Sequence, residues 1–216
     1  MKKYFKIVGI VLGVVIVLGI VGSLMDDKQS STTSIQTAVN PEYNMANELK
    51  KDATRRVDSL KSHFNYQYDE FNKIGFYTHK NFSNDNIVKM NKKGILTCYC
   101  NSDGGKYVTS FYIGSDWLNH THFFTLINDN KMPSQVVSIS DKNNVRKVGD
   151  GYVLENVTYK REITNFDLIG MNADKEIKVR LEGDSGNVDF SLSKPEKQGF
   201  NETYELANAL MILNSK

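Results

Sequence analysis

The amino-acid sequence predicts an α+β protein with an N-terminal transmembrane helix, followed by an antiparallel β-sheet domain flanked by an N-terminal and a C-terminal amphipathic helix. Three observations predict this class. Residues 7–25 carry no charged side chain. Apolar residues recur every three or four positions after residue 40 and again near the C-terminus. Between residues 71 and 193 they recur every second position, which is the period of a β-strand.

The uncharged run from Ile7 to Met25 is long enough to cross a membrane, because a helix of this length spans about 28 Å. Residues 1–6 form a basic tip with three lysines, and two aspartates follow the run. The positive-inside rule therefore predicts a cytoplasmic N-terminus and a C-terminal domain outside the cell membrane.

A cleaved signal peptide is the alternative interpretation of residues 7–25. The apolar run exceeds the usual length of such a peptide's core, although Val21-Gly22-Ser23 is a tolerable cleavage site. The sequence favours the uncleaved anchor.

Small residues are spaced along the predicted membrane helix in a way that permits close helix packing. Gly9 and Gly13 form one small-xxx-small pair, and Gly19 and Ser23 form another. A homodimer through this face is a hypothesis, since glycine is also common in membrane helices generally.

Residues 26–39 are rich in Ser and Thr without an apolar period, which predicts a flexible tether. A coil of this length reaches about 20 Å. Residues 40–216 then form one extracytoplasmic domain. Its charge is nearly balanced, with 24 Lys and Arg against 23 Asp and Glu from residue 28 onward. Balanced charge predicts no nucleic-acid partner.

The first helix of the domain is predicted to begin at Asn40-Pro41, a cap residue followed by a proline at the first helical position. We expect about 22 residues with one apolar stripe. The stripe consists of Met45, Leu49, Ala53, Val57, Leu60 and Phe64. Packing on the domain's own sheet is the favoured interpretation, and a partner-binding helix is the alternative.

Alternating runs after the first helix predict six to eight antiparallel strands in a sandwich or partly open barrel. The runs are centred on Phe76, Cys98, Phe111, Val157, Val179 and Phe190. Gly183-Asp184-Ser185-Gly186 stands between the last two, which predicts a hairpin. The same four letters surround the nucleophile of trypsin-like proteases, but no matching histidine site occurs, so the hairpin interpretation is preferred.

A closing helix follows, with Ser193 and Glu196 as one start signal and Asn201 as another. Its expected apolar face covers one side of the sheet. That face consists of Phe200, Tyr204, Ala207, Leu210 and Met211.

His120 and His122 are the candidate metal ligands. If this segment is a strand, both imidazoles project from one face and could bind one metal ion. A third ligand is needed, and Asp116, Cys98 or Cys100 are candidates. The alternative is ordinary hydrogen bonding near Trp117, which the sequence favours.

Cys98 and Cys100 lie two residues apart, so on a strand both sulfurs share one face and point in parallel. This geometry is poor for a disulfide, and two buried free thiols are the preferred interpretation. A bond between chains, or a strained local one, is the alternative in an oxidising compartment.

Trp117, Phe123 and Phe124 form an aromatic group near the end of a predicted strand. Aromatic side chains in such a group usually anchor a core, whereas an exposed group would be a recognition patch. The chain contains no glycine-rich phosphate loop or dinucleotide fingerprint, so no cofactor is predicted.

The chain resembles small bacterial membrane-anchored cell-envelope proteins of unassigned function, which carry a signal anchor or lipid anchor and one β-rich domain. The resemblance rests on Tyr112–Trp117, Gly151–Glu155, Val179–Gly183 and Leu206–Leu213. It departs from the lipid-anchored members because no cysteine lies near residue 25. The resemblance implies architecture and location and no catalytic residues.

These observations predict a single-pass membrane protein whose outer domain is a binding or structural module of the cell envelope. Expected partners are the lipid bilayer through residues 7–25 and an envelope protein or glycan. An envelope hydrolase with a metal site at His120 and His122 is one alternative, although an enzyme is not favoured. A protective membrane protein of a phage or mobile element is the other.

Overall fold

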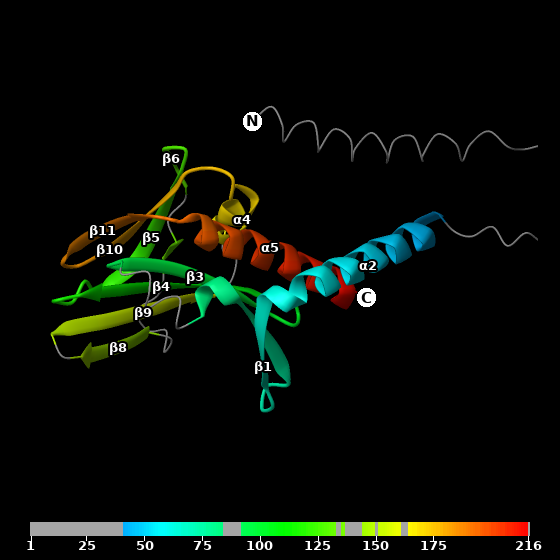
Figure 1. Cartoon of the computed structure of the whole chain (residues 1–216), viewed down its shortest axis with the longest axis horizontal. Coiled ribbons are helices and arrows are strands. Elements are labelled where there is room, and N and C mark those ends of the chain that lie inside the picture. Colours follow the sequence, from blue (N-terminus) through cyan, green and yellow to red (C-terminus); the bar gives the residue numbers. More distant parts are fainter. Residues whose placement is uncertain are drawn as a thin grey trace, which may run out of the picture. The chain divides into compact units, whose positions relative to one another are not determined.

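The computed structural model describes residues 41–83, 92–132, 135–136, 144–149, 151–160 and 164–215. These residues form an α+β domain of antiparallel sheets and three α-helices (Figure 1), which confirms the predicted class. The predicted transmembrane run and tether lie outside the described residues. Within the described ranges, no helix combines the length and apolar character needed to span a membrane.

The larger sheet is curled and has six antiparallel strands in the order β1-β2-β3-β4-β9-β8. Their bounds, in that order, are Phe64–Asp69, Ile74–His79, Gly94–Asn101, Lys106–Gly114, Tyr152–Lys160 and Asn144–Gly149. Strand β2 pairs with β3 only from Phe76 to Thr78. The tip of the β1–β2 hairpin therefore projects beyond the rest of the sheet (Figure 1).

The smaller sheet has the order β11-β10-β5-β6, and β7 also pairs with β5. Its strands, in chain order from β5, are His120–Ile127, Asn130–Lys131, Gln135–Val136, Ile177–Gly183 and Gly186–Ser191. The predicted hairpin is confirmed, with Gly183 opposite Gly186. A side chain at Gly183 would meet the backbone oxygen of Leu118 at 2.1 Å, so this glycine permits close packing of the neighbouring segment.

The two sheets share one core with helices α4 (Thr164–Met171) and α5 (Lys194–Asn214). The alternate residues of β3 that were predicted to face inward, Leu96 and Cys98, are buried there. Phe123 and Leu181 of the smaller sheet and Phe200 of α5 pack in the same cluster. Both cysteines are free and buried, as predicted, and burial raises the pKa of the Cys100 thiol to about 12.

Helix α2 spans Pro41–Leu60 and packs beside the C-terminal half of α5 (Figure 1). Only part of its apolar stripe is covered. Ala53 and Leu60 are buried, whereas Met45 is 62 % exposed and Leu49 is 54 % exposed. The helix is shorter than predicted, because Phe64 belongs to strand β1 and a 3₁₀ turn, η2 (Lys61–His63), separates them.

Helix α5 begins at the first of the two predicted starts. The buried Glu196 carboxylate accepts hydrogen bonds from the Ser193 backbone N–H and hydroxyl, both at 2.6 Å. It also receives the Lys92 ammonium at 2.6 Å. A carboxylate in this position satisfies groups at the helix start that otherwise have no partner. Gly199 is tolerated inside the helix because the Phe82 ring packs against its backbone.

The described residues contain eleven strands, more than the six to eight predicted. Strand β1 is absent from the prediction, because its first residue, Phe64, continues the helical stripe of the sequence. Strands β6 and β7 have two residues each, too few to show an alternating pattern. Helix α4 was missed for a related reason, since eight residues give few helical turns.

Candidate functional site

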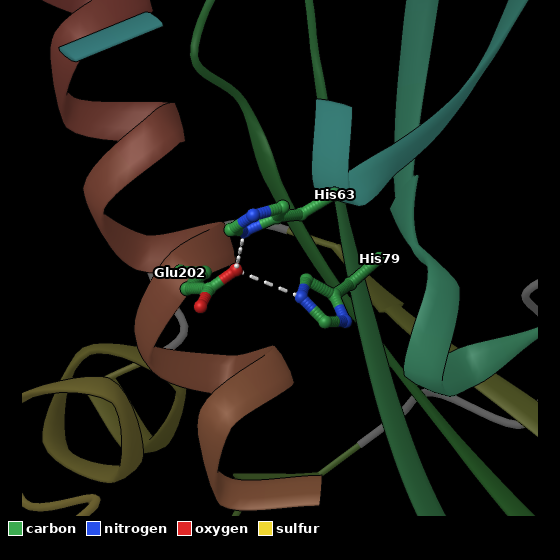
Figure 2. Close-up of side chains that lie close together, drawn as sticks. All are labelled: His63, His79 and Glu202. Atoms are coloured by element: carbon green, nitrogen blue, oxygen red, sulfur yellow. Dashed lines mark hydrogen bonds and ion pairs between the residues drawn. The ribbon is translucent and has the colours of Figure 1, made fainter. Parts of the chain in front are cut away.

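Two histidines and a glutamate from three separate elements meet beside helix α5 (Figure 2). His63 ends the 3₁₀ turn η2, His79 ends strand β2, and Glu202 lies on α5. The pairing of β1 with β2 brings the two histidines together, because Phe64 lies opposite His79. We call these three residues the His–Glu–His cluster.

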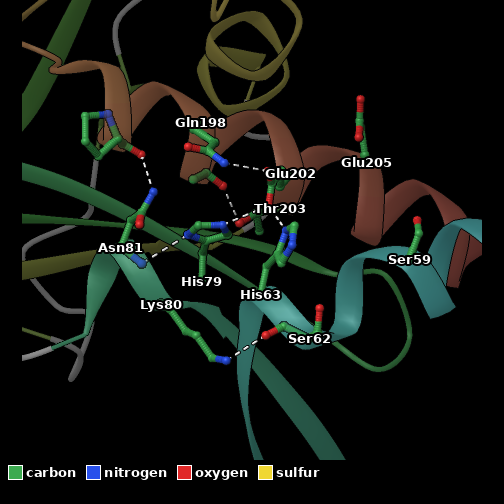
Figure 3. Close-up of polar contacts among 12 residues, drawn as sticks. Ser59, Ser62, His63, His79, Lys80, Asn81, Gln198, Glu202, Thr203 and Glu205 are labelled. Atoms are coloured by element: carbon green, nitrogen blue, oxygen red, sulfur yellow. Dashed lines mark hydrogen bonds and ion pairs between the residues drawn. The ribbon is translucent and has the colours of Figure 1, made fainter.

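A single carboxylate oxygen of Glu202 holds both imidazoles. Its Oε2 lies 2.7 Å from His63 Nδ1 and 2.9 Å from His79 Nε2. The other oxygen, Oε1, accepts a hydrogen bond from the Gln198 side chain at 2.9 Å (Figure 3). Both carboxylate oxygens are therefore occupied, which fixes the orientation of the glutamate.

The hydrogen bond at Nδ1, the second ring nitrogen of His79, determines which nitrogen carries the proton. Nδ1 accepts a hydrogen bond from the Asn81 backbone N–H at 3.1 Å, which caps the 3₁₀ turn η3 (Lys80–Phe82). A nitrogen that accepts a hydrogen bond carries no proton, so His79 is neutral and its Nε2–H donates to Glu202. His63 Nδ1 likewise donates to this carboxylate.

Burial and hydrogen bonding act on these groups in opposite directions. Burial lowers the pKa of His79, and this effect exceeds the opposing influence of Glu202. Burial alone would raise the pKa of Glu202, but the hydrogen bonds from Gln198, His63 and His79 together lower it below its usual range. The favoured state at neutral pH is a Glu202 carboxylate beside a neutral His79 imidazole.

The cluster has the donor types of a metal site, and its ligand atoms all lie within 4.8 Å of one another. The surroundings of His79 oppose metal binding. A histidine that binds metal through Nε2 carries its proton on Nδ1 and donates it to an acceptor. Here Nδ1 faces another donor, the Asn81 N–H. The geometry fits a hydrogen-bonded junction better than a metal centre.

The cluster joins the base of the β1–β2 hairpin to helix α5. His79 is 3 % exposed and packs edge-to-face against Phe64, with ring centroids 5.1 Å apart. Nearby, Lys80 Nζ donates to the Ser62 carbonyl oxygen and Asn81 Nδ2 donates to the Pro195 carbonyl oxygen (Figure 3). These contacts fix the hairpin where it leaves the domain.

The hairpin itself carries an open groove of about 540 Å³. It is lined by Gln67, Tyr68, Asp69, Glu70, Phe76, Thr78 and Tyr99. Tyr99 stacks on Tyr107 with ring planes 4° apart and centroids 4.7 Å apart. The groove thus combines flat aromatic surfaces with amide, hydroxyl and carboxylate groups.

Exposed aromatic side chains gather on the same hairpin. Tyr66 is 55 % exposed, Tyr68 is 51 % exposed and Phe71, in the turn, is 99 % exposed. Aromatic residues with this exposure often mark recognition surfaces.

The predicted metal pair, His120 and His122, does not share a face of strand β5. His120 lies opposite Gly183 and His122 lies opposite Glu182, so Thr121 is an extra residue in the pairing. Such a bulge shifts the alternation of the strand. His120 is consequently buried at 2 % exposure, while His122 is partly exposed and its Nδ1 bonds the Thr121 hydroxyl. The predicted shared face was wrong because of this bulge.

His120 instead belongs to a buried chain of polar groups. Its Nε2 lies 2.9 Å from Ser110 Oγ, and its Nδ1 donates to Glu155 Oε2 at 3.0 Å. Glu155 also accepts the backbone N–H groups of Leu118, Asn119 and His120. Burial lowers the pKa of His120 despite the neighbouring Glu155, which favours the neutral ring.

This serine, histidine and glutamate have the connectivity of a catalytic triad. Ser110 is 0 % exposed, and its hydroxyl also lies 3.3 Å from the Tyr159 hydroxyl in the core. A nucleophile must reach a substrate, so this burial favours a structural role. These hydrogen-bonded polar groups hold residues 115–119 against the larger sheet.

The predicted aromatic patch is divided by the strand geometry. Phe123 is fully buried against Tyr159, whereas Phe124 is partly exposed beneath the Lys131 ammonium, 4.3 Å from the ring centroid. Trp117 is partly exposed, with the Arg146 guanidinium 5.8 Å from its ring. Adjacent strand residues point to opposite faces, so Phe123 and Phe124 cannot form one surface.

The proposed helix contacts at Gly9, Gly13, Gly19 and Ser23 lie outside the described residues. The sequence analysis missed the His–Glu–His cluster and the hairpin groove. The three residues of the cluster form no short motif in the sequence, because strand pairing and helix packing bring them together. The one available signal was the Phe-Asn-Tyr-Gln-Tyr alternation of residues 64–68.

Comparison with known proteins gave no family: no family model, curated protein or solved structure matches this chain.

Proposed function

We propose that this chain is a membrane-anchored binding module of the bacterial cell envelope. Residues 7–25 form its single transmembrane anchor, residues 26–39 are the tether, and the two-sheet domain lies outside the membrane. The observation that carries this proposal is the β1–β2 hairpin, which lines a groove together with Tyr99 of β3 and carries three exposed aromatic residues.

Of the two expected partner classes, the groove favours a glycan over a protein. Aromatic faces such as Tyr99 and Phe76 can cover the apolar face of a sugar ring. Glu70 and Gln67 can accept hydrogen bonds from its hydroxyl groups. The volume of about 540 Å³ falls within the usual range for a small-ligand site.

The alternative of a hydrolase with a metal at His120 and His122 has less support. The bulge at Thr121 separates the two rings, and His120 is already bonded to Ser110 and Glu155.

The test is co-sedimentation of residues 40–216 with purified cell-wall glycan, using the unchanged protein and two variants. Tyr99→Ala removes an aromatic side chain from the groove face, and Tyr152→Ala removes a tyrosine on strand β9 that lies outside the groove. We expect the first variant to lose at least tenfold in affinity and the second to bind normally. Binding that is absent, or equal for all three proteins, would reject the glycan.

The broader proposal of an envelope partner is tested by proximity labelling with the full chain in cells. We expect the set of labelled envelope proteins to change with Tyr68→Ala and to remain unchanged with Tyr152→Ala. A set that neither variant alters would reject the hairpin as the binding surface.

A further inference from the structure

The six-stranded sheet ends in two edge strands, β1 and β8, and the two edges differ in composition. Edge strands expose unpaired backbone groups, and proteins usually protect them with charges, short length or covering elements. Strand β8 carries Arg146 and Lys147, both exposed. Strand β1 has no Lys, Arg, Pro or Gly in its six residues.

The other edges of the described sheets are also protected. Strand β6 has two residues, one of which is Lys131. Strand β11 carries Asp189, which is paired with Arg180. The single charge of β1, Asp69, is occupied within the hairpin turn, where it accepts the backbone N–H groups of Phe71 and Asn72. Strand β1 is thus an edge strand without a basic side chain, and its one acidic side chain is engaged in the hairpin turn.

We propose that strand β1 pairs with β1 of a second copy of this chain, joining two six-stranded sheets across a two-fold axis. The pairing goes beyond the proposed ligand function, because it concerns assembly. Residues 65–68 of β1 are exposed, and β1 ends the strand order of its sheet among the described residues.

The sequence of β1 is complementary to itself. In the proposed dimer, the two β1 strands are antiparallel and the two-fold axis is perpendicular to the joined sheet. Each residue of β1 then lies opposite a residue of the second copy whose side chain is on the same face of the sheet. On β1, Phe64, Tyr66 and Tyr68 share one face, and Asn65, Gln67 and Asp69 share the other. Every such register therefore sets aromatic against aromatic and polar against polar, and cross-strand aromatic pairs are favourable.

Two central registers are available. In the first, Tyr66 faces Tyr66 of the second copy and Asn65 faces its Gln67. In the second, Gln67 faces Gln67 of the second copy. Neither register opposes two carboxylates.

The occupant is a second copy because the same chain supplies the complementary strand. The predicted anchor and tether would hold copies in one membrane, which raises their effective concentration. Pairing would also extend the groove, since Gln67 and Tyr68 of β1 line it and the second copy would add its own.

The experiment is oxidative cross-linking of the full chain in membranes, with a single cysteine introduced at the edge. Tyr66→Cys reports the first register and Gln67→Cys reports the second. Val148→Cys, at a residue of β8 that is 75 % exposed, is the matched control on the opposite edge. The native Cys98 and Cys100 are buried, and the unchanged chain provides the background.

We expect a dimer of twice the chain mass at position 66 or 67, at least fivefold more abundant than at position 148. The absence of a dimer at both β1 positions would overturn the proposal. Equal dimer at position 148 and at the stronger of positions 66 and 67 would also overturn it, because this indicates random collision or contact through the membrane helices alone. An adduct of β1 with a different protein would identify another occupant and reject self-pairing.

Discussion

At the scale of single residues, Glu202 is the group on which the hairpin junction depends. One oxygen accepts from both His63 and His79, and the other accepts from Gln198. The hydrogen bonds come from separate elements, so the carboxylate ties the end of η2 and the end of β2 to α5.

Glu202→Gln keeps the shape of the side chain but removes the charge that two N–H donors share. We expect the free energy of unfolding to fall by about 1–3 kcal/mol, because the mostly buried His79 donor loses its charged acceptor. Urea unfolding of residues 40–216, a compact unit by itself, measures this loss. Glu48→Gln, at an exposed helix pair with Lys51, is the control and should change stability by less than about 0.5 kcal/mol. Equal effects of the two changes would contradict this role.

The neutral state of His79 predicts a dependence of stability on pH. Burial holds the folded pKa of His79 below the ordinary histidine value of 6.5, so the folded state binds fewer protons than the unfolded state. The contribution is fully present above about pH 6.5 and is lost as pH falls through the folded pKa. His120 acts in the same direction. Stability should therefore decline between pH 7 and pH 5.

Unfolding of residues 40–216 measured across this range tests the pH prediction. His79→Gln keeps a donor toward Glu202 but cannot be protonated, so its stability should vary less with pH than that of the unchanged protein. The same slope in both proteins would show that His79 does not cause the dependence.

The sequence could not predict which side chains of the site lie close together in the folded domain. His120 and His122 were predicted to share a face from strict alternation, and one extra residue, Thr121, cancelled that inference. His63 and His79 are sixteen positions apart and meet because a hairpin joins them. The buried free cysteines were predictable because their spacing on one strand opposes a disulfide and because cysteine usually behaves as a small core residue.

At the scale of elements, periodicity identified those whose packing extends along their whole length. Strands β10 and β11 alternate clearly because one face of each contacts the core. Helix α2 is the exception. Its apolar stripe is continuous in the sequence, but Met45 and Leu49 remain exposed while Ala53 and Leu60 are buried. The periodicity of α2 predicts which of its faces can be buried. The position of α5 beside it determines how much of that face is buried.

Two leucine substitutions in α2 test this division. Leu60→Ala should destabilise the domain by about 2–5 kcal/mol, since the side chain packs with Phe64 and Leu206 in a buried cluster. Leu49→Ala, eleven residues earlier in the same stripe, should change stability by less than about 0.5 kcal/mol because the side chain is exposed. Thermal or urea unfolding of the two variants gives the comparison. A large loss for Leu49→Ala would show that another surface covers it.

At the scale of the whole molecule, two hydrogen-bonded polar networks attach segments of the domain to a neighbouring helix or sheet. The His–Glu–His cluster attaches the hairpin to α5, and the Ser110–His120–Glu155 chain attaches the segment before β5 to the larger sheet. Charged and polar groups inside a domain require such partners. The α+β class was predictable from composition and period, whereas these attachments depend on contacts between distant residues.

The anchor that we propose for residues 7–25 would set the location of the molecule, and its test uses the full chain. We expect the full chain to remain with membranes after washing with high salt, because an apolar helix of this length is held by the bilayer and not by charge. Residues 40–216 alone should be recovered without membranes. In protoplasts, external protease should remove the outer domain while a cytoplasmic marker stays intact. N-terminal sequencing that began near Ser23 would instead establish a cleaved signal peptide, and a protected domain would reverse the predicted orientation.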